Sequence, residues 1–344
     1  MLLALQSILC VILVVLVGTW LSQSADILAE KSGLGRTWAG AVLLAGATSL
    51  PELATGVSAI AVFNAPDLAA GGIFGSCLFN LLLLVLLDIF SGPEPLLKRV
   101  QIGHTLAAGL GSVLLGVAAA GMLLARTNYN LTLGWVGIPS IVAIALYLLS
   151  VRMLAQFERR RRTEVLQQEA EVFQYQHIKP QQAYLRFILL SIAIVVLGVW
   201  LASLGDRIAS VTGLGESFIG ALVLAATTSL PEAVAGIAAI RLNALDLAVS
   251  NIFGSNIFNL AILGIYDIVY LRGNLWADIS QVHIFTAVVA MIMTSVAIVG
   301  LIYRAARPAN IYYLGWDGAD CPLHWWDVCY LSWLKKEATV GANF

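Results

Sequence analysis

A five-residue sequence, TSLPE, occurs twice in this chain, at residues 48–52 and 228–232, each time inside a stretch apolar enough to span a lipid bilayer. Proline has no N–H and clashes with the carbonyl one turn back, so each helix is expected to break there and to release carbonyl oxygens. A glutamate at membrane depth costs about 3 kcal/mol even on lenient insertion scales, so it needs protein around it. The repeat therefore predicts two broken membrane helices that turn Glu52 and Glu232 inward.

The composition is that of an integral membrane protein. Of 344 residues, 60% are hydrophobic and 11% are charged, whereas soluble domains carry about 25% charged residues. The net charge of −1 gives no indication of a nucleic-acid partner, and none is expected. The four cysteines have no metal-binding or disulfide-framework spacing. We therefore expect the lipid bilayer as the surrounding partner and no cofactor.

Apolar windows of about 20 residues or more predict the membrane-spanning helices. We interpret the first window as a transmembrane helix rather than a signal peptide, because it is long and no Lys or Arg precedes it. Nine helices are expected, at about 2–21, 37–62, 66–90, 103–125, 131–154, 184–204, 216–240, 245–270 and 281–303.

Lys and Arg are concentrated in alternate connections between these helices. The long hydrophilic segment 155–183 carries four consecutive arginines, Arg159–Arg162, and is predicted to be a solvated linker. Because positive loops stay in the cytoplasm, this linker is expected inside the cell and the N-terminus outside, in the cell membrane.

The two halves of the chain match well beyond the TSLPE sequence. Glu52 pairs with Glu232 at an offset of 232 − 52 = 180, and Asp67, Asp88 and His104 pair with Asp246, Asp267 and His283 at an offset of 179. Five helices precede the second copy, so the copies enter the membrane from opposite sides. The predicted fold is an all-α membrane protein with an inverted repeat of five plus five helices, in which broken helices place a site near the midplane.

The end of the chain breaks this symmetry. Residues 314–316 match 133–135, which open the fifth helix, but 317–344 contain no apolar span. Either the tenth helix is lost or truncated, or the reading frame changes near Trp316. We divide the chain into a first repeat (1–154), a linker (155–183), a second repeat (184–316) and an atypical polar tail (317–344).

Neutral oxygen donors accompany each broken helix. The next helix bears a serine and, four residues later, an asparagine: Ser76 and Asn80 in the first half, Ser255 and Asn259 in the second. Residues four apart share a helix face, so both pairs can point into the bundle. Carboxylate, hydroxyl and amide oxygens suit hard cations such as Ca²⁺, whereas zinc and copper prefer Cys and His. Two glutamates are balanced by one Ca²⁺, two monovalent ions or two protons.

The pattern resembles the sodium/calcium exchanger family of Ca²⁺:cation antiporters, over both signature repeats at about 33–90 and 213–270. The resemblance implies that Glu52 and Glu232 supply the central Ca²⁺ carboxylates, with oxygens of Thr48 and Thr228. It also implies flanking Na⁺ positions and two asparagines between the glutamates. The implied Na⁺ ligands are Ser49, Ser229, Ser76, Ser255 and the carbonyls of Ala45 and Ala225, and the asparagines are Asn80 and Asn259.

Some positions depart from the family pattern. Asn259 stands where the second repeat often has Asp, and Gly72 and Cys77 stand where Asn is usual, although Asn251 and Asn256 keep both amides in the second half. The expected function is a secondary antiporter that exchanges Ca²⁺ for Na⁺ by alternating access.

Other functions remain open at this point. The first alternative is an H⁺-coupled exchanger of Ca²⁺ or another divalent cation, and a remote alternative is a non-transporting scaffold. An intramembrane aspartyl protease built on Asp88 and Asp267 is disfavoured, because both lie at span ends and on opposite faces. No enzymatic activity is expected.

Overall fold

The computed structural model describes residues 2–33, 35–127, 132–166, 175, 178–212 and 227–304, without the side chains of 161–166, 206, 209, 210 and 212. Within these ranges the regular secondary structure is helical apart from one sheet of two short strands. Eight helices in the same ranges are long and apolar enough to cross a membrane, counting the interrupted helix over 35–61 as one. The predicted all-α membrane fold is confirmed.

The long helices are α1 (Leu2–Ser32), α5 (Pro66–Phe90), α7 (His104–Leu124), α8 (Ile138–Leu166), α9 (Pro180–Thr212), α12 (Leu245–Val269) and α14 (Val282–Tyr303). The interrupted helix of the first half is divided into α2 (Gly35–Trp38), the π-helix η1 (Ala39–Leu44), α3 (Ala45–Thr48) and α4 (Leu50–Ala61). Its counterpart is described from residue 227 and continues as α11 (Leu230–Arg241). The short elements are α6 (Leu96–Arg99), α13 (Leu275–Asp278), β1 (Thr132–Leu133) and β2 (Val136–Gly137).

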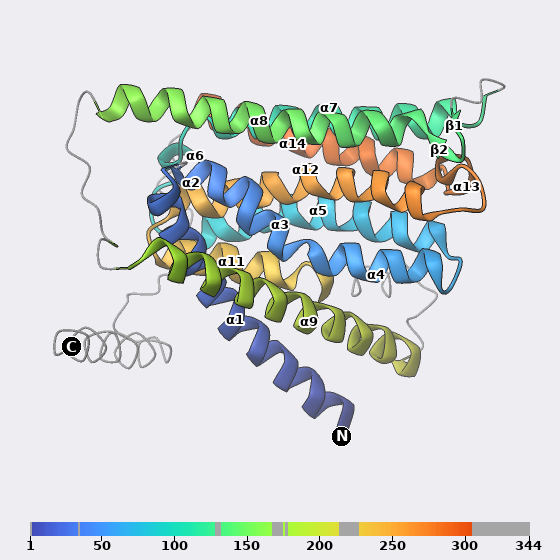
Figure 1. Cartoon of the computed structure of the whole chain (residues 1–344), viewed down its shortest axis with the longest axis horizontal. Helices are drawn as coiled ribbons and strands as arrows, with labels where there is room; N and C mark the ends of the chain where they lie inside the picture. The colour runs from blue at the N-terminus through green and yellow to red at the C-terminus, as the bar shows by residue number, and fades with distance from the viewer. Residues whose placement is uncertain are drawn as a thin grey trace. The chain divides into compact units, whose positions relative to one another are not determined.

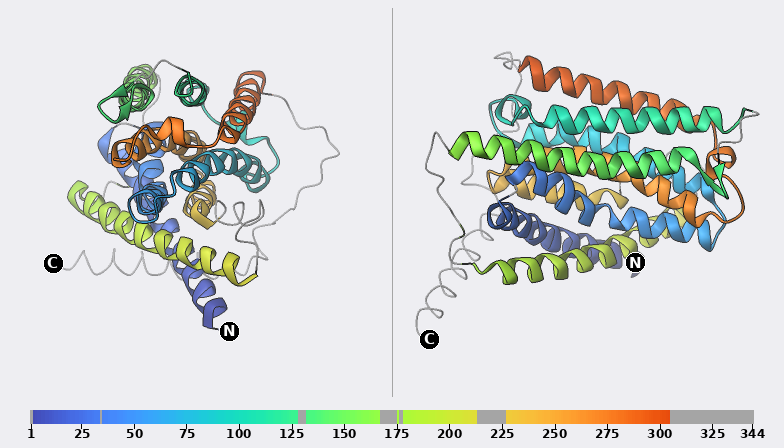
Figure 2. Two further views of the ribbon diagram at one scale, coloured as in Figure 1. Left: turned by 90° about the vertical axis from the view of Figure 1, so that its right-hand side faces the viewer. Right: turned by 45° about the horizontal axis from the view of Figure 1, so that its top comes forward.

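Helix α12 lies at the centre of the described bundle. It contacts α5, α7, α8, α11 and η1, and 78% of its most apolar window is buried, more than in any other described span. Figures 1 and 2 show α7, α8 and α14 together on one side of α12 and α5, and α1 and α9 on the other side. Its buried residues include Ser255, Asn256 and Asn259, so α12 brings polar side chains to the centre of the bundle.

The break predicted at the first TSLPE copy is present, and it is local. The helix is interrupted at Ser49 (φ −93°, ψ 2°), and Pro51 occupies the first turn of α4, where its missing N–H costs nothing. One turn earlier, η1 winds as a π-helix, a form that is rare and frequent at functional sites. Gly254 allows α12 to cross at this point, because an added Cβ would lie 2.3 Å from the carbonyl oxygen of Ala41.

Helices α5 and α12 run antiparallel, as an inverted repeat requires. At the start of α5, Asp67 contacts His283 at the start of α14 (2.9 Å). At the start of α12, Asp246 contacts His104 at the start of α7 (2.8 Å). Each repeat thus supplies the aspartate of one pair and the histidine of the other, at opposite ends of the bundle. The predicted inverted arrangement is confirmed for the helices that the structure describes.

Asp88 and Asp267 have the same structural contact in both halves. Asp88 accepts a hydrogen bond from the backbone N–H of Leu96 (2.5 Å), and Asp267 accepts one from Leu275 (2.9 Å), so each holds the start of the short helix that follows. Asp267 also accepts from Gly137 N–H and the Ser140 hydroxyl. These contacts account for both aspartates as structural residues.

Several helix boundaries differ from the predicted ones. Helix α1 continues to Ser32, eleven residues past the predicted end at 21, because Ser22–Ala29 pack into the bundle instead of ending at a membrane surface. The span predicted at 131–154 starts later, at Ile138, because residues 132–137 form the β1–β2 hairpin around Gly134 (φ 68°). The predicted span 216–240 lies partly outside the described residues, and the tail 317–344 lies wholly outside them.

Part of the segment 155–183 contacts the bundle. Helix α8 continues into it as far as Leu166. Tyr175 donates its backbone N–H to Glu30 (3.0 Å) and its hydroxyl to Asp26 (3.0 Å), which also forms an ion pair with Arg36 (2.6 Å). Burial, followed by the charge of Asp26, raises the pKa of the Tyr175 phenol above its ordinary value, so it remains a donor.

Candidate cation site

The two TSLPE copies have nearly the same backbone and meet at the centre of the bundle. Ser49 (φ −93°, ψ 2°) and Ser229 (φ −89°, ψ 9°) precede α4 and α11, and each proline sits in the first turn that follows. Glu52 and Glu232 therefore both lie in the first turn of a helix, where the N-terminal end of the helix dipole favours negative charge.

Both glutamates are buried. The Glu52 side chain is 4% exposed and Glu232 is fully buried. Ser49 donates a hydrogen bond to Oε1 of Glu232 (2.8 Å), so the first repeat binds the carboxyl group of the second. Ser229 is placed equivalently but donates to the Ser76 hydroxyl (3.1 Å). The carboxyl group of Glu52 lies near both of these hydroxyls and near Glu232, yet within the described residues neither of its oxygens has a hydrogen-bond partner at normal distance.

Asparagines connect α5 to α12 next to the glutamates. Asn80 donates through Nδ2 to Oδ1 of Asn256 (3.1 Å), and Asn256 donates through its own Nδ2 to the carbonyl of Cys77 (3.2 Å). Thr48 lies 3.5 Å from Oδ1 of Asn251, although its stronger bond is to the Leu44 carbonyl (3.0 Å). The contact between the repeats is therefore made by amides as well as hydroxyls.

A set of buried polar atoms has no hydrogen-bond partner among the described residues. Buried polar groups nearly always have one, so such atoms need an explanation. They are mostly oxygens of the kind that hard cations bind. Within the site they are both carboxyl oxygens of Glu52, Oε2 of Glu232, Oδ1 of Asn80, the Ser255 hydroxyl, Nδ2 of Asn251 and the amide of Asn259.

The donor set suits Ca²⁺ or Na⁺ better than zinc or copper. No group of three or more His, Cys, Asp or Glu side chains that could hold a metal occurs in the part of the chain that the structure describes. The two carboxyl groups are instead surrounded by hydroxyls and amides, as expected for cations that prefer neutral and anionic oxygen. The structure brings Glu52, Glu232, Ser49, Ser229 and Ser76 together directly.

The other predicted residues have less direct contacts. Asn80 bonds to α12, and Thr48 donates mainly to the Leu44 carbonyl but also lies near the carboxyl group of Glu232. Thr228, Ser255 and Asn259 are buried, the last two on α12. The Ala45 carbonyl accepts from Ser49 N–H (3.0 Å), and Ala225 lies outside the described residues.

Tyr266 is a neighbour of the site that the sequence did not single out. Its hydroxyl donates to the backbone carbonyl of Glu52 (2.6 Å), and it fits there because residue 56 is glycine: an added Cβ would lie 1.8 Å from that hydroxyl. The equivalent position in the first half is Leu87, which packs against Gly236. A comparison of the two halves could have found this difference, since an apolar residue in one copy is a hydrogen-bond donor in the other.

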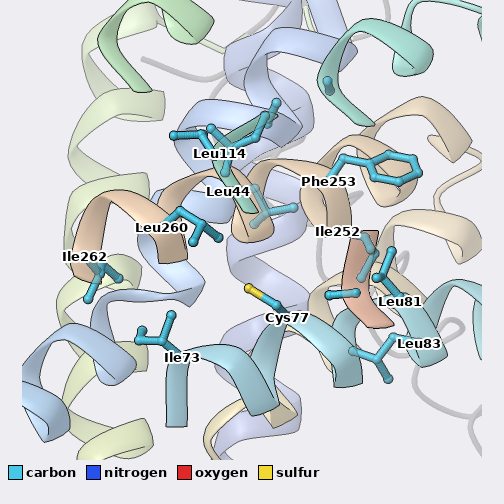
Figure 3. Packing of buried hydrophobic residues seen from close by; sticks show 14 of the residues in the cluster. Leu44, Ile73, Cys77, Leu81, Leu83, Leu114, Ile252, Phe253, Leu260 and Ile262 are labelled. Carbon is cyan, nitrogen blue, oxygen red and sulfur yellow. The ribbon is translucent and has the colours of Figure 1, made fainter. Parts of the chain in front are cut away.

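Cys77 is a buried packing residue. It is fully buried and carries a free thiol. Figure 3 shows it projecting from α5 among apolar side chains of a buried cluster that includes Ile252 and Leu260 of α12. This placement agrees with a small residue between packed helices.

Comparisons with known proteins give a consistent result. The chain matches the family model described as Sodium/calcium exchanger protein over residues 2–155 and 182–326. It is 30% identical over 247 residues to Inner membrane protein YrbG of Escherichia coli (strain K12), covering 70% of this chain and 71% of YrbG. A shorter match, 31% identical over 136 residues, covers 37% of this chain and 25% of Sodium/potassium/calcium exchanger 5 of Homo sapiens.

The fold is also similar to solved structures. The structure of the sodium-calcium exchanger NCX_Mj soaked with 2.5 mM Na⁺ and 1 mM Sr²⁺ superposes with a TM-score of 0.66, covering 88% of this chain and 91% of that one at 22% identity. The NCX_Mj structure soaked with zero Na⁺ and Ca²⁺ gives a TM-score of 0.65 at 21% identity. At these identities the likeness concerns the fold alone.

Proposed function

Because the chain belongs to the sodium/calcium exchanger family, we propose that it exchanges Ca²⁺ for Na⁺ across the cell membrane at a site built on Glu52 and Glu232. The family and the eight apolar helices of the described residues make it a multi-pass membrane protein and a cation antiporter of the exchanger type. The choice of Na⁺ as the coupling ion, and of these glutamates as ligands, is the proposal.

One observation carries the proposal. Two buried carboxyl groups, one from each inverted repeat, lie near each other, and three of their four oxygens have no hydrogen-bond partner in the described residues. An uncompensated buried charge is very unfavourable, so ionised carboxylates at this position need cations. One Ca²⁺ or two Na⁺ neutralise the same pair, which is the stoichiometric basis for exchange.

The mechanism we propose is alternating access. Helices α1 and α9 are related by the repeat, pack against each other, and contact α11 and α4, the helices that carry the glutamates (Figure 1). Movement of this pair along the bundle would open the site to one membrane face at a time. Occupancy by Ca²⁺ or by Na⁺ would allow the movement, because the empty site leaves two carboxylates unneutralised.

The test is ion flux in liposomes reconstituted with the full chain. With equal pH on both sides, an outward Na⁺ gradient should drive ⁴⁵Ca²⁺ uptake, and choline in place of Na⁺ should abolish it. The Glu52→Gln/Glu232→Gln protein is the inactive control. Uptake that follows a pH gradient and ignores Na⁺ would instead support H⁺-coupled exchange through the same carboxylates. No uptake with either gradient would overturn exchange itself.

A further inference from the structure

The hydrogen bonds around Asn256 determine which atom Asn80 can offer to an ion. A backbone carbonyl can only accept a hydrogen bond, so the Cys77 carbonyl fixes Asn256 with its NH₂ group toward α5. Oδ1 of Asn256 then faces Asn80, which must donate its own NH₂ group. The remaining atom, Oδ1 of Asn80, is buried and has no hydrogen-bond partner within the described residues.

The first half has no asparagine in the position that corresponds to Asn256. Asn259 is the repeat equivalent of Asn80, and Cys77 is the repeat equivalent of Asn256, because 256 − 77 and 259 − 80 both equal 179. The Cys77 thiol lies beside the Asn259 amide, but a thiol is a weak donor and a weak acceptor, so this contact does not hold the amide firmly in one orientation. Both Nδ2 and Oδ1 of Asn259 are without a hydrogen-bond partner in the described residues.

We infer that Asn256 is a positioning residue that presents the Asn80 oxygen to the cation, and that Cys77 leaves the Asn259 amide unoriented. The inference rests on the proposed function, because it assigns a task to a residue beside the proposed site. Ligands held in place by neighbouring hydrogen bonds bind metal more tightly, and losing such a neighbour typically lowers metal affinity about 10- to 100-fold. The two halves therefore contribute unequally: the first repeat offers a fixed amide oxygen and the second an amide free to turn.

The decisive experiment is a double-mutant cycle on Ca²⁺ affinity, measured by isothermal titration of the full detergent-solubilised chain. Asn256→Leu removes both hydrogen bonds at similar volume and should weaken Ca²⁺ binding about 10-fold. Asn80→Asp replaces the amide by a carboxylate, whose two oxygens are equivalent and need no orientation. In the Asn80→Asp background, Asn256→Leu should therefore leave the Ca²⁺ affinity unchanged or raise it.

The cycle separates positioning from simple structural damage. Equal weakening by Asn256→Leu in both backgrounds would overturn the inference, because a packing defect does not depend on which group occupies position 80. Failure of the wild-type protein to bind Ca²⁺ would instead remove the proposed function and the inference with it. If the wild type binds Ca²⁺ but Asn256→Leu has the same effect in both backgrounds, only the inference about Asn256 is overturned.

A second variant tests the other half independently. Cys77→Asn supplies the missing amide next to Asn259 and should tighten Ca²⁺ binding, whereas Cys77→Ser should leave the affinity unchanged. If both substitutions change the affinity equally, the orientation of Asn259 is not what limits the second repeat.

Discussion

Glu52 and Glu232 are equivalent in the repeated sequence but have different surroundings in the folded protein. Glu232 accepts a hydrogen bond from Ser49, and the backbone carbonyl of Glu52 accepts one from Tyr266. The carboxyl group of Glu52 has no such partner among the described residues. The Ser229 and Ser76 hydroxyls lie beside that carboxyl group and form a hydrogen bond with each other. At the residue scale, the site is a pair of buried carboxyl groups: Ser49 donates to that of Glu232, and the Ser229 and Ser76 hydroxyls lie beside that of Glu52.

Glu52→Gln and Glu232→Gln should each weaken Ca²⁺ binding by more than about 100-fold, because changes to neighbours of a ligand already cost about 10- to 100-fold. Isothermal titration measures the effect. Glu94→Gln is the matched control, since Glu94 is exposed and pairs only loosely with Lys98 (3.8 Å). Near-normal Ca²⁺ affinity in either glutamate variant would contradict the proposed site.

At the element scale, glycines decide where helices meet. Gly56 makes room for the Tyr266 hydroxyl, and Gly254 lets α12 cross the π-helix. The sequence predicted the break at Pro51, because proline chemistry is local. The π-helix before it was not predicted, and neither was the Tyr266 contact, since that contact depends on a side chain of α12 that is far away in the sequence.

Gly56→Ala should destabilise the protein by about 1–3 kcal/mol, because its Cβ would lie 1.8 Å from the Tyr266 hydroxyl and an overpacked core must shift. Thermal unfolding in detergent measures this change. The repeat-equivalent Gly236→Ala is the control, since its Cβ would meet Leu87 at 3.2 Å, which a small movement relieves. Equal melting temperatures for the two variants would show that the Tyr266 side chain moves away from an added Cβ at position 56 without a loss of stability.

At the scale of the whole molecule, the two halves of the inverted repeat contact each other through equivalent pairs of residues. Asp67 reaches His283, and Asp246 reaches His104, so each half is held to the other at both ends of the bundle. The contacts are unequal, because the Asp67 side chain is 58% exposed and the His104 side chain is fully buried. Because positively charged loops stay in the cytoplasm, we propose that the end of the bundle that carries Lys98 faces the cytoplasm.

The orientation can be tested with single cysteines in a background where Cys10, Cys77, Cys321 and Cys329 are replaced by serine. In intact cells, a membrane-impermeant maleimide should label Arg272→Cys but not Lys98→Cys, and it should label both after the membrane is opened. The opposite pattern would place the N-terminus inside and reverse the orientation.

The sequence by itself determined the membrane class, the inverted repeat, the helix breaks and the residue types found at the candidate cation site. Each of these follows from hydropathy, periodicity or the covalent chemistry of proline, which act over a few residues. Only the tertiary structure decided that Ser49 binds Glu232 rather than Glu52, that Asn256 fixes Asn80, and that Tyr266 reaches the Glu52 carbonyl. These contacts join residues more than 170 positions apart, and their partners are selected by how antiparallel helices pack, which no local pattern records.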